Sequence, residues 1–122
     1  MLFLFRHELT DEARAIEKAL THFAEAARLA PLDVEYARAY AETFYGVPKA
    51  DWRAAAEAWE HVREISPNPD FALVNLARVH LRMGQHGAAA GFVERIQSPE
   101  FERVKAKIKS QIAEQTKAAN AH

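Results

Sequence analysis

The amino-acid sequence predicts an all-α protein, built as a stack of antiparallel helical hairpins with about six helices. Apolar residues recur every three or four positions along most of the 122-residue chain, which is the period of an amphipathic helix. Only 4 Gly and 5 Pro occur while alanine is abundant, and this balance favours helices over a turn-rich β fold. A strand needs apolar residues at every second position, and only residues 1–5 are ambiguous in this respect.

The expected helices begin and end at residues that commonly mark helix boundaries. Side chains able to cap a helix start stand at Thr10, Asp11, Asp33, Asp51 and Ser98. Helix-stopping residues stand at Pro31, Gly46, Pro67 and Gly84. These signals place helices at about residues 10–31, 33–46, 51–65, 70–84, 85–96 and 99–117. The connections are short, so neighbouring helices should run antiparallel.

A pattern of bulky and small residues repeats along the chain. Six residues recur by type 36 positions later: Ile16, Ala19, Phe23, Ala26, Leu29 and Pro31 precede Trp52, Ala55, Trp59, Val62, Ile65 and Pro67. A second match spans 34 positions: Trp52, Ala55, Trp59 and Val62 precede His86, Ala89, Val93 and Ile96. Small side chains let two helix axes approach and bulky ones fill the groove beside them, so the pattern predicts repeated, closely packed helical hairpins.

This pattern resembles the tetratricopeptide repeat (TPR) family, whose unit is a helical hairpin of about 34 residues. The best copy, at about residues 70–98, has His80 in place of the family's usual Tyr and carries the pattern at Leu73, Leu76, Ala77, His80, Gly84, Ala89, Val93 and Ile96. Another copy spans about residues 34–67, a half repeat about 10–31, and a capping helix about 99–117. The resemblance implies one domain over residues 1–122, folded as a right-handed TPR-like α-solenoid.

The resemblance also implies a protein–protein interaction module, a scaffold, adaptor or co-chaperone-like domain without catalysis. Such modules bind a peptide or helix of another protein on the concave face formed by the first helix of each repeat. The residues expected on that face are Arg38, Glu42, Tyr45, Phe71, Val74, Asn75, Arg78, Leu81 and Arg82, with Glu35, Glu102 and Lys109 beside them. The arginines suit carboxylates and the apolar members suit apolar side chains. A mixed, solvated face is the alternative interpretation, and Glu42 argues against the family's carboxylate clamp.

Two other classes of function stay open. A homo-oligomeric assembly, such as a homodimer, would pair through the repeat ends, and the apolar residues 1–5 are candidates for that interface. A small helical enzyme or metal binder is the second alternative. Glu57, His61 and Glu64 share one helix face, but a metal site usually needs ligands from another element as well. A surface hydrogen bond or ion pair is therefore the expected role of this group.

Composition argues against several kinds of chemistry and partner. The absence of Cys excludes disulfides and thiolate sites, and no phosphate-binding loop or nucleophile motif is present. The net charge of -1 disfavours nucleic-acid binding, although charge runs from -5 over residues 1–70 to +3 over residues 101–122. No apolar run is long enough for a membrane span and no signal peptide is recognisable. We therefore expect a cytoplasmic protein with no cofactor and no metal.

Overall fold

The computed structural model describes residues 11–120, and this part of the chain is entirely helical, as predicted. It contains six α-helices, two short 3-10 turns and no strand. The elements are α2 (Asp11–Leu29), α3 (Val34–Thr43), η1 (Phe44–Gly46), α4 (Trp52–Ile65), α5 (Asp70–Arg82), α6 (His86–Arg95), η2 (Pro99–Phe101) and α7 (Glu102–Asn120). Thr10 and residues 1–5, singled out in the sequence, lie outside the described residues.

Two of the predicted caps form as expected. The Asp33 side chain accepts a hydrogen bond from the backbone N–H of Tyr36 at 3.2 Å, and Asp51 accepts one from Ala54 at 3.1 Å. Each carboxylate satisfies an N–H that the first helical turn leaves without a partner. Gly84 follows α5 with a φ of 73°, a left-handed conformation that glycine adopts without steric cost. These local signals define the boundaries of α3, α4 and α5.

The start of the last helix differs from the prediction. Ser98 makes no side-chain cap, and a 3-10 turn over Pro99–Phe101 precedes α7. The Ser98 hydroxyl instead donates to the carboxylate of Asp70 on α5. A buried carboxylate needs hydrogen-bond donors, and this contact across the fold takes the side chain that the sequence assigned to capping.

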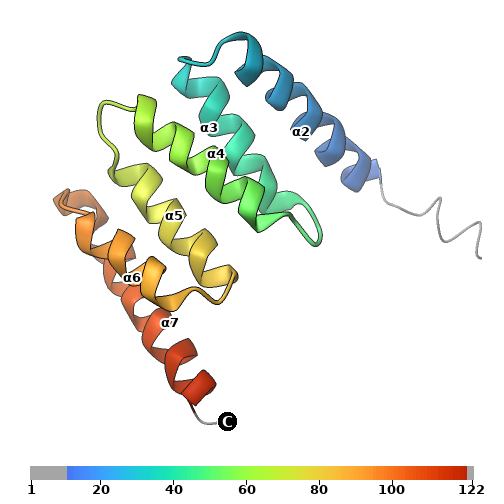
Figure 1. Cartoon of the computed structure of the whole chain (residues 1–122). Helices are drawn as coiled ribbons and strands as arrows, with labels where there is room; N and C mark the ends of the chain where they lie inside the picture. Colours follow the sequence, from blue (N-terminus) through green and yellow to red (C-terminus); the bar gives the residue numbers. More distant parts are fainter. Residues whose placement is uncertain (1–10, 121–122) are drawn as a thin grey trace, which may run out of the picture.

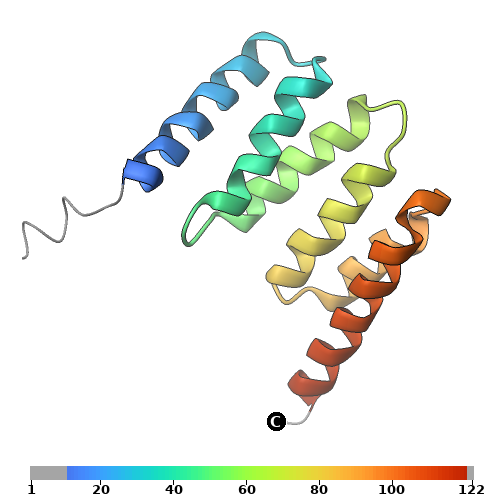
Figure 2. The same cartoon turned by 180° about the vertical axis from the view of Figure 1, so that it is seen from behind.

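Helices that are consecutive in the chain are also neighbours in space. Each of α2 to α6 packs on the next helix, and α7 lies against both α5 and α6. Figures 1 and 2 show these helices running alternately up and down and displaced along one row. The N-terminal end of the row is therefore α2, and α5 lies inside it.

The core follows the repeated pattern of small and bulky residues. Residues of α4 and the residues 34 positions later, in α6 or directly after it, are both buried. The pairs are Ala55 and Ala89, Trp59 and Val93, and Val62 and Ile96. Trp59 is completely buried and its ring packs against Phe71 of α5 at 5.7 Å between centroids. Nine of the 13 residues of α5 are buried, and none of α2 is. Burial is therefore concentrated around α5.

The α2 end of the row exposes apolar side chains. Leu29 is 69% exposed, Leu32 80% and Tyr36 42%. In the repeated pattern Leu29 corresponds to Ile65, which packs against the core. Leu29, the last residue of α2, is instead exposed. None of the helices over residues 11–120 combines the length and apolar character needed to cross a bilayer.

Candidate functional site

The fold brings arginines and aromatic rings from four elements together on one surface. Tyr45 of η1 lies 5.9 Å from Trp52 and 6.3 Å from Trp59 of α4, between ring centroids. The guanidinium carbon of Arg82 lies 4.8 Å from the Trp52 centroid and 5.4 Å from that of Tyr45. Arg38 and Phe71 lie beside this group. We call the five residues Arg38, Tyr45, Trp52, Phe71 and Arg82 the arginine–aromatic cluster.

Arg38 is held by two contacts within the protein. Its guanidinium carbon lies 3.9 Å from the centre of the Phe71 ring, and its Nε donates to Glu42 Oε1 at 2.8 Å. The two side chains are 48% and 46% exposed, so the ion pair adds little stability. It places a negative charge beside the Arg38 guanidinium. Glu42 thus serves as the partner of Arg38 on this surface.

Tyr45 and Asn75 form a hydrogen bond that fastens η1 to α5. The Tyr45 hydroxyl donates to Asn75 Oδ1 at 2.8 Å, and Asn75 Nδ2 donates to the backbone carbonyl of Phe71 at 2.9 Å. Burial raises the pKa of Tyr45 to about 12, although the positive charges of Arg78 and Arg82 act in the opposite direction. Tyr45 therefore stays a neutral hydrogen-bond donor at physiological pH.

Three residues predicted to face a ligand are buried instead. Val74, Asn75 and Leu81 are 2%, 3% and 6% exposed. The reason is that α5 is packed against α4, α6 and α7, so little of its circumference reaches solvent. Asn75 also uses both ends of its amide inside the protein, as buried polar groups require. Leu81 and Asn75 therefore stabilise the fold, while Val74 reaches only the floor of the groove described next.

A groove of about 490 Å³ lies between α5 and the C-terminal η2–α7 segment. We call it the α5–α7 groove, and its lining residues are Phe71, Val74, Arg78, Glu100, Phe101, Arg103, Val104 and Lys107. Phe71 connects it to the arginine–aromatic cluster. The sequence placed the last helix at this face through Glu102 and Lys109, but it did not reveal the η2 and α7 residues that line the groove. Lys109 turns toward α6, where its Nζ lies 3.7 Å from Glu94 Oε1.

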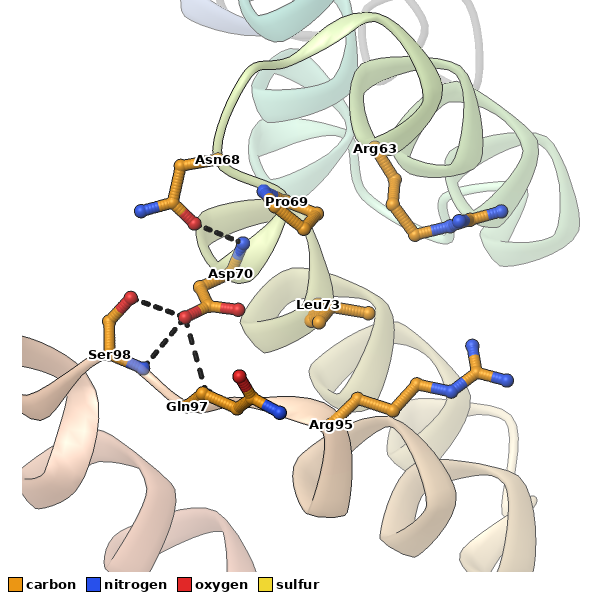
Figure 3. Close-up of a pocket in the computed structure, with 8 residues that line it drawn as sticks. All are labelled: Arg63, Asn68, Pro69, Asp70, Leu73, Arg95, Gln97 and Ser98. Carbon is orange, nitrogen blue, oxygen red and sulfur yellow. Dashed lines mark hydrogen bonds between the residues drawn. The ribbon is translucent and has the colours of Figure 1, made fainter.

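A second hollow, of about 620 Å³, surrounds the start of α5 and is structural in character (Figure 3). Asp70 Oδ2 accepts hydrogen bonds from the backbone N–H groups of Ser98 at 2.8 Å and Gln97 at 3.3 Å, and from the Ser98 hydroxyl. Burial alone raises the pKa of Asp70, but these hydrogen bonds outweigh it and hold the pKa below its usual range. Arg63 is paired with Glu60 at 2.7 Å, and in Figure 3 it extends away from the carboxylate.

Two histidines, His61 and His80, make contacts to neighbouring elements. His61 Nε2 lies 2.6 Å from the carbonyl oxygen of Pro31, which joins α4 to the loop after α2. His80 Nδ1 lies 2.6 Å from Gln85 Oε1, and its ring stacks on Phe92 at 5.0 Å. Over residues 11–120, no group of three or more His, Cys, Asp or Glu side chains is arranged to hold a metal ion. His61 therefore acts as a structural contact to the α2–α3 loop.

The arginine–aromatic cluster and the α5–α7 groove share Phe71, so they adjoin each other. Together they bring basic residues and aromatic rings from α3, η1, α4, α5, η2 and α7 to one region. Comparisons of the chain with family models, with characterised proteins and with solved structures gave no match.

Proposed function

We propose that this chain is a cytoplasmic protein–protein interaction module, organised as a right-handed, TPR-like helical repeat. In this proposal it binds a peptide or a helix of another protein on the surface shared by α3, α5 and α7. The binding involves no catalytic step and no cofactor. The single observation that carries the proposal is the arginine–aromatic cluster, which joins residues of four elements on one accessible surface.

The composition of this surface is that of a binding site. Arginine and aromatic side chains are enriched in protein interfaces and among the residues that dominate their energetics. Arg38 and Arg82 lie over rings, and such contacts favour one arrangement of each side chain. Restricting side chains before binding lowers the entropic cost of association.

The test is a selection of random displayed peptides on the immobilised protein, followed by calorimetric titration of the enriched sequences. We expect a peptide that binds in one-to-one stoichiometry. The double variant Arg78→Ala and Arg82→Ala should weaken its binding roughly thirtyfold, since each of the two arginine contacts contributes on the order of 1 kcal/mol. The matched control Arg14→Ala with Lys117→Ala removes the same charge from distant exposed positions. Lack of any enriched peptide, or equal weakening in both double variants, contradicts the proposal.

Self-assembly is a second candidate, and the exposed end of the row favours it. Leu29, Leu32 and Tyr36 leave apolar area in solvent, and α2 contributes no buried side chain. Exposed apolar surface of this kind marks interfaces. Sedimentation velocity over a wide concentration range tests this candidate. A dimer that Leu29→Glu with Leu32→Glu converts to monomer supports it, and a monomer at every concentration refutes it.

A further inference from the structure

We propose that the α5–α7 groove binds an acidic, apolar segment of the partner protein. An aliphatic or aromatic side chain of that segment lies on the floor of the groove, and flanking carboxylates meet Arg78, Arg103 and Lys107. This inference rests on the proposed function and adds the chemistry of the partner and the place where it binds.

The floor of the groove is apolar and is formed by residues of both α5 and the η2–α7 segment. Phe71 and Val74 belong to α5, and Phe101 and Val104 to the η2–α7 segment. Val74 is 2% exposed, while Phe71, Phe101 and Val104 are partly buried and pack against the core. Their positions are therefore set by the fold. A groove of about 490 Å³ has room for a few side chains, a size typical of ligand-binding clefts.

The cations at the rim have no partners of their own. In the range 11–120, Arg78, Arg103 and Lys107 take part in no hydrogen bond and no ion pair. Among the other basic residues of the same face, Arg38 is paired with Glu42 and Arg82 lies over two rings. The groove thus gathers three cations that have neither an ion pair nor a ring contact within the described residues.

The charges are placed to flank an apolar anchor. On α7, Lys107 lies one turn beyond Arg103 and Val104, and on α5, Arg78 lies one turn beyond Val74. Both helices therefore present an apolar residue next to a cation. Glu100 is the one carboxylate among the lining residues, which leaves a net charge of +2. Complementarity then requires a partner with apolar residues and an excess of carboxylates.

The experiment uses a synthetic peptide with blocked ends, built of Glu residues with Leu and Phe at helical spacing. Fluorescence anisotropy measures its Kd for the full chain, and two-dimensional amide NMR locates the contact. A peptide with Lys in place of every Glu is the matched ligand control. We expect the acidic peptide alone to bind, to shift the amides of Val74, Phe101 and Val104, and to bind more weakly as salt increases.

Two protein variants test the assignment of the charges. Arg103→Gln with Lys107→Gln should raise the Kd roughly tenfold, because loss of each exposed ion pair changes affinity about threefold. Arg14→Gln with Lys117→Gln removes the same net charge outside the groove and should leave the Kd within about twofold. Gln has nearly the helix propensity of Arg and Lys, so none of the four substitutions should disturb the fold. Val104→Thr, a polar isostere on the floor, should weaken binding without removing charge.

The outcomes separate this inference from the function on which it rests. Equal Kd values for the two double variants, or amide shifts confined to Tyr45 and its neighbours, overturn the groove assignment while the interaction module stands. The same holds if displayed peptides bind but the acidic peptide does not. If no peptide of either kind binds, both proposals fail. Sedimentation must show a monomer, since a dimer that occupies the groove would overturn the choice of an acidic partner segment.

Discussion

Replacing Asp70 gives the sharpest test of how this fold is held together. Asp70 is 6% exposed, and its Oδ2 accepts from two backbone N–H groups and one hydroxyl of residues 27 and 28 positions further along the chain. Removing the acceptor leaves the N–H groups of Gln97 and Ser98 without partners. Each loss costs about 1–3 kcal/mol. Both residues are partly accessible to water, so Asp70→Ala should lower the free energy of unfolding by about 3 kcal/mol, near the lower end of the sum.

The smaller substitutions divide this effect into parts. Asp70→Asn keeps an oxygen acceptor but loses the charge, and should cost about 1.5 kcal/mol, because charge-assisted hydrogen bonds are roughly twice as strong as neutral ones. Ser98→Ala removes the hydroxyl donor alone and should cost about 1 kcal/mol. Urea unfolding followed by far-ultraviolet circular dichroism measures all three. A cost below about 0.5 kcal/mol for Asp70→Ala would refute the reasoning, since it would mean that water replaces the carboxylate freely.

The pH dependence of the same variants tests the charged state. The folded-state pKa of Asp70 lies below its usual range, so its contribution to stability is fully present above the unfolded-state pKa, near 4. It is lost as the pH falls through the folded-state pKa. The difference between the wild-type chain and Asp70→Asn should therefore stay constant from neutral pH to about pH 4 and shrink only below it. A difference that does not change down to complete acid unfolding contradicts this assignment.

Three further predictions concern other features of the fold. Tyr45→Phe removes the hydrogen bond to Asn75 and should cost about 1 kcal/mol in urea unfolding. The pKa of Tyr45 is raised to about 12, so in the wild-type chain its contribution to stability is present below about pH 10 and is lost as the pH rises toward about 12. An ultraviolet titration in which every tyrosine ionises near pH 10 contradicts this prediction. Gly84→Ala should destabilise by about 1 kcal/mol because of its positive φ, whereas Gly91→Ala, inside α6 with open space around it, should stabilise by up to about 1 kcal/mol, and equal effects on the melting temperature would refute this. Trp59→Ala should cost about 3–5 kcal/mol, as expected for a completely buried aromatic side chain, and a loss below about 1 kcal/mol would argue against this packing.

The elements of the fold were predictable because their signals are local. Asp33 and Asp51 cap the helices that they precede within three residues, and Gly84 ends α5 through its own backbone conformation. The spacing of Ala55 and Trp59 on one helix is enough to assign both to the core. Such information is contained in a few consecutive residues, so it can be recognised without knowledge of the tertiary contacts.

The contacts that build the candidate site depend on the tertiary structure, and the sequence predicted them only in part. Asp70 and Ser98 meet across 28 positions, so nothing near Ser98 showed that its hydroxyl would be used there. Val74 and Leu81 lie on the helix stripe that should face a ligand, yet neighbouring helices cover them. Trp52 packs against the core, yet nothing in the sequence showed that Arg82 would lie over its ring. Helical periodicity predicts which residues share a face, but it does not predict how many neighbours that face has.

The uneven burial along the row has a consequence for how the molecule opens. The outermost described helix at the N-terminal end, α2, has no buried side chain, whereas α5 has nine. In a row where helices contact mainly their chain neighbours, cooperativity is local and the end units separate at a lower free-energy cost than the middle. Native-state hydrogen exchange should therefore show fast amides in α2, slower ones in α3, and the slowest in α5, which opens only when the whole domain unfolds. The partially opened state, with α2 detached, exposes the side of α3 that α2 otherwise covers.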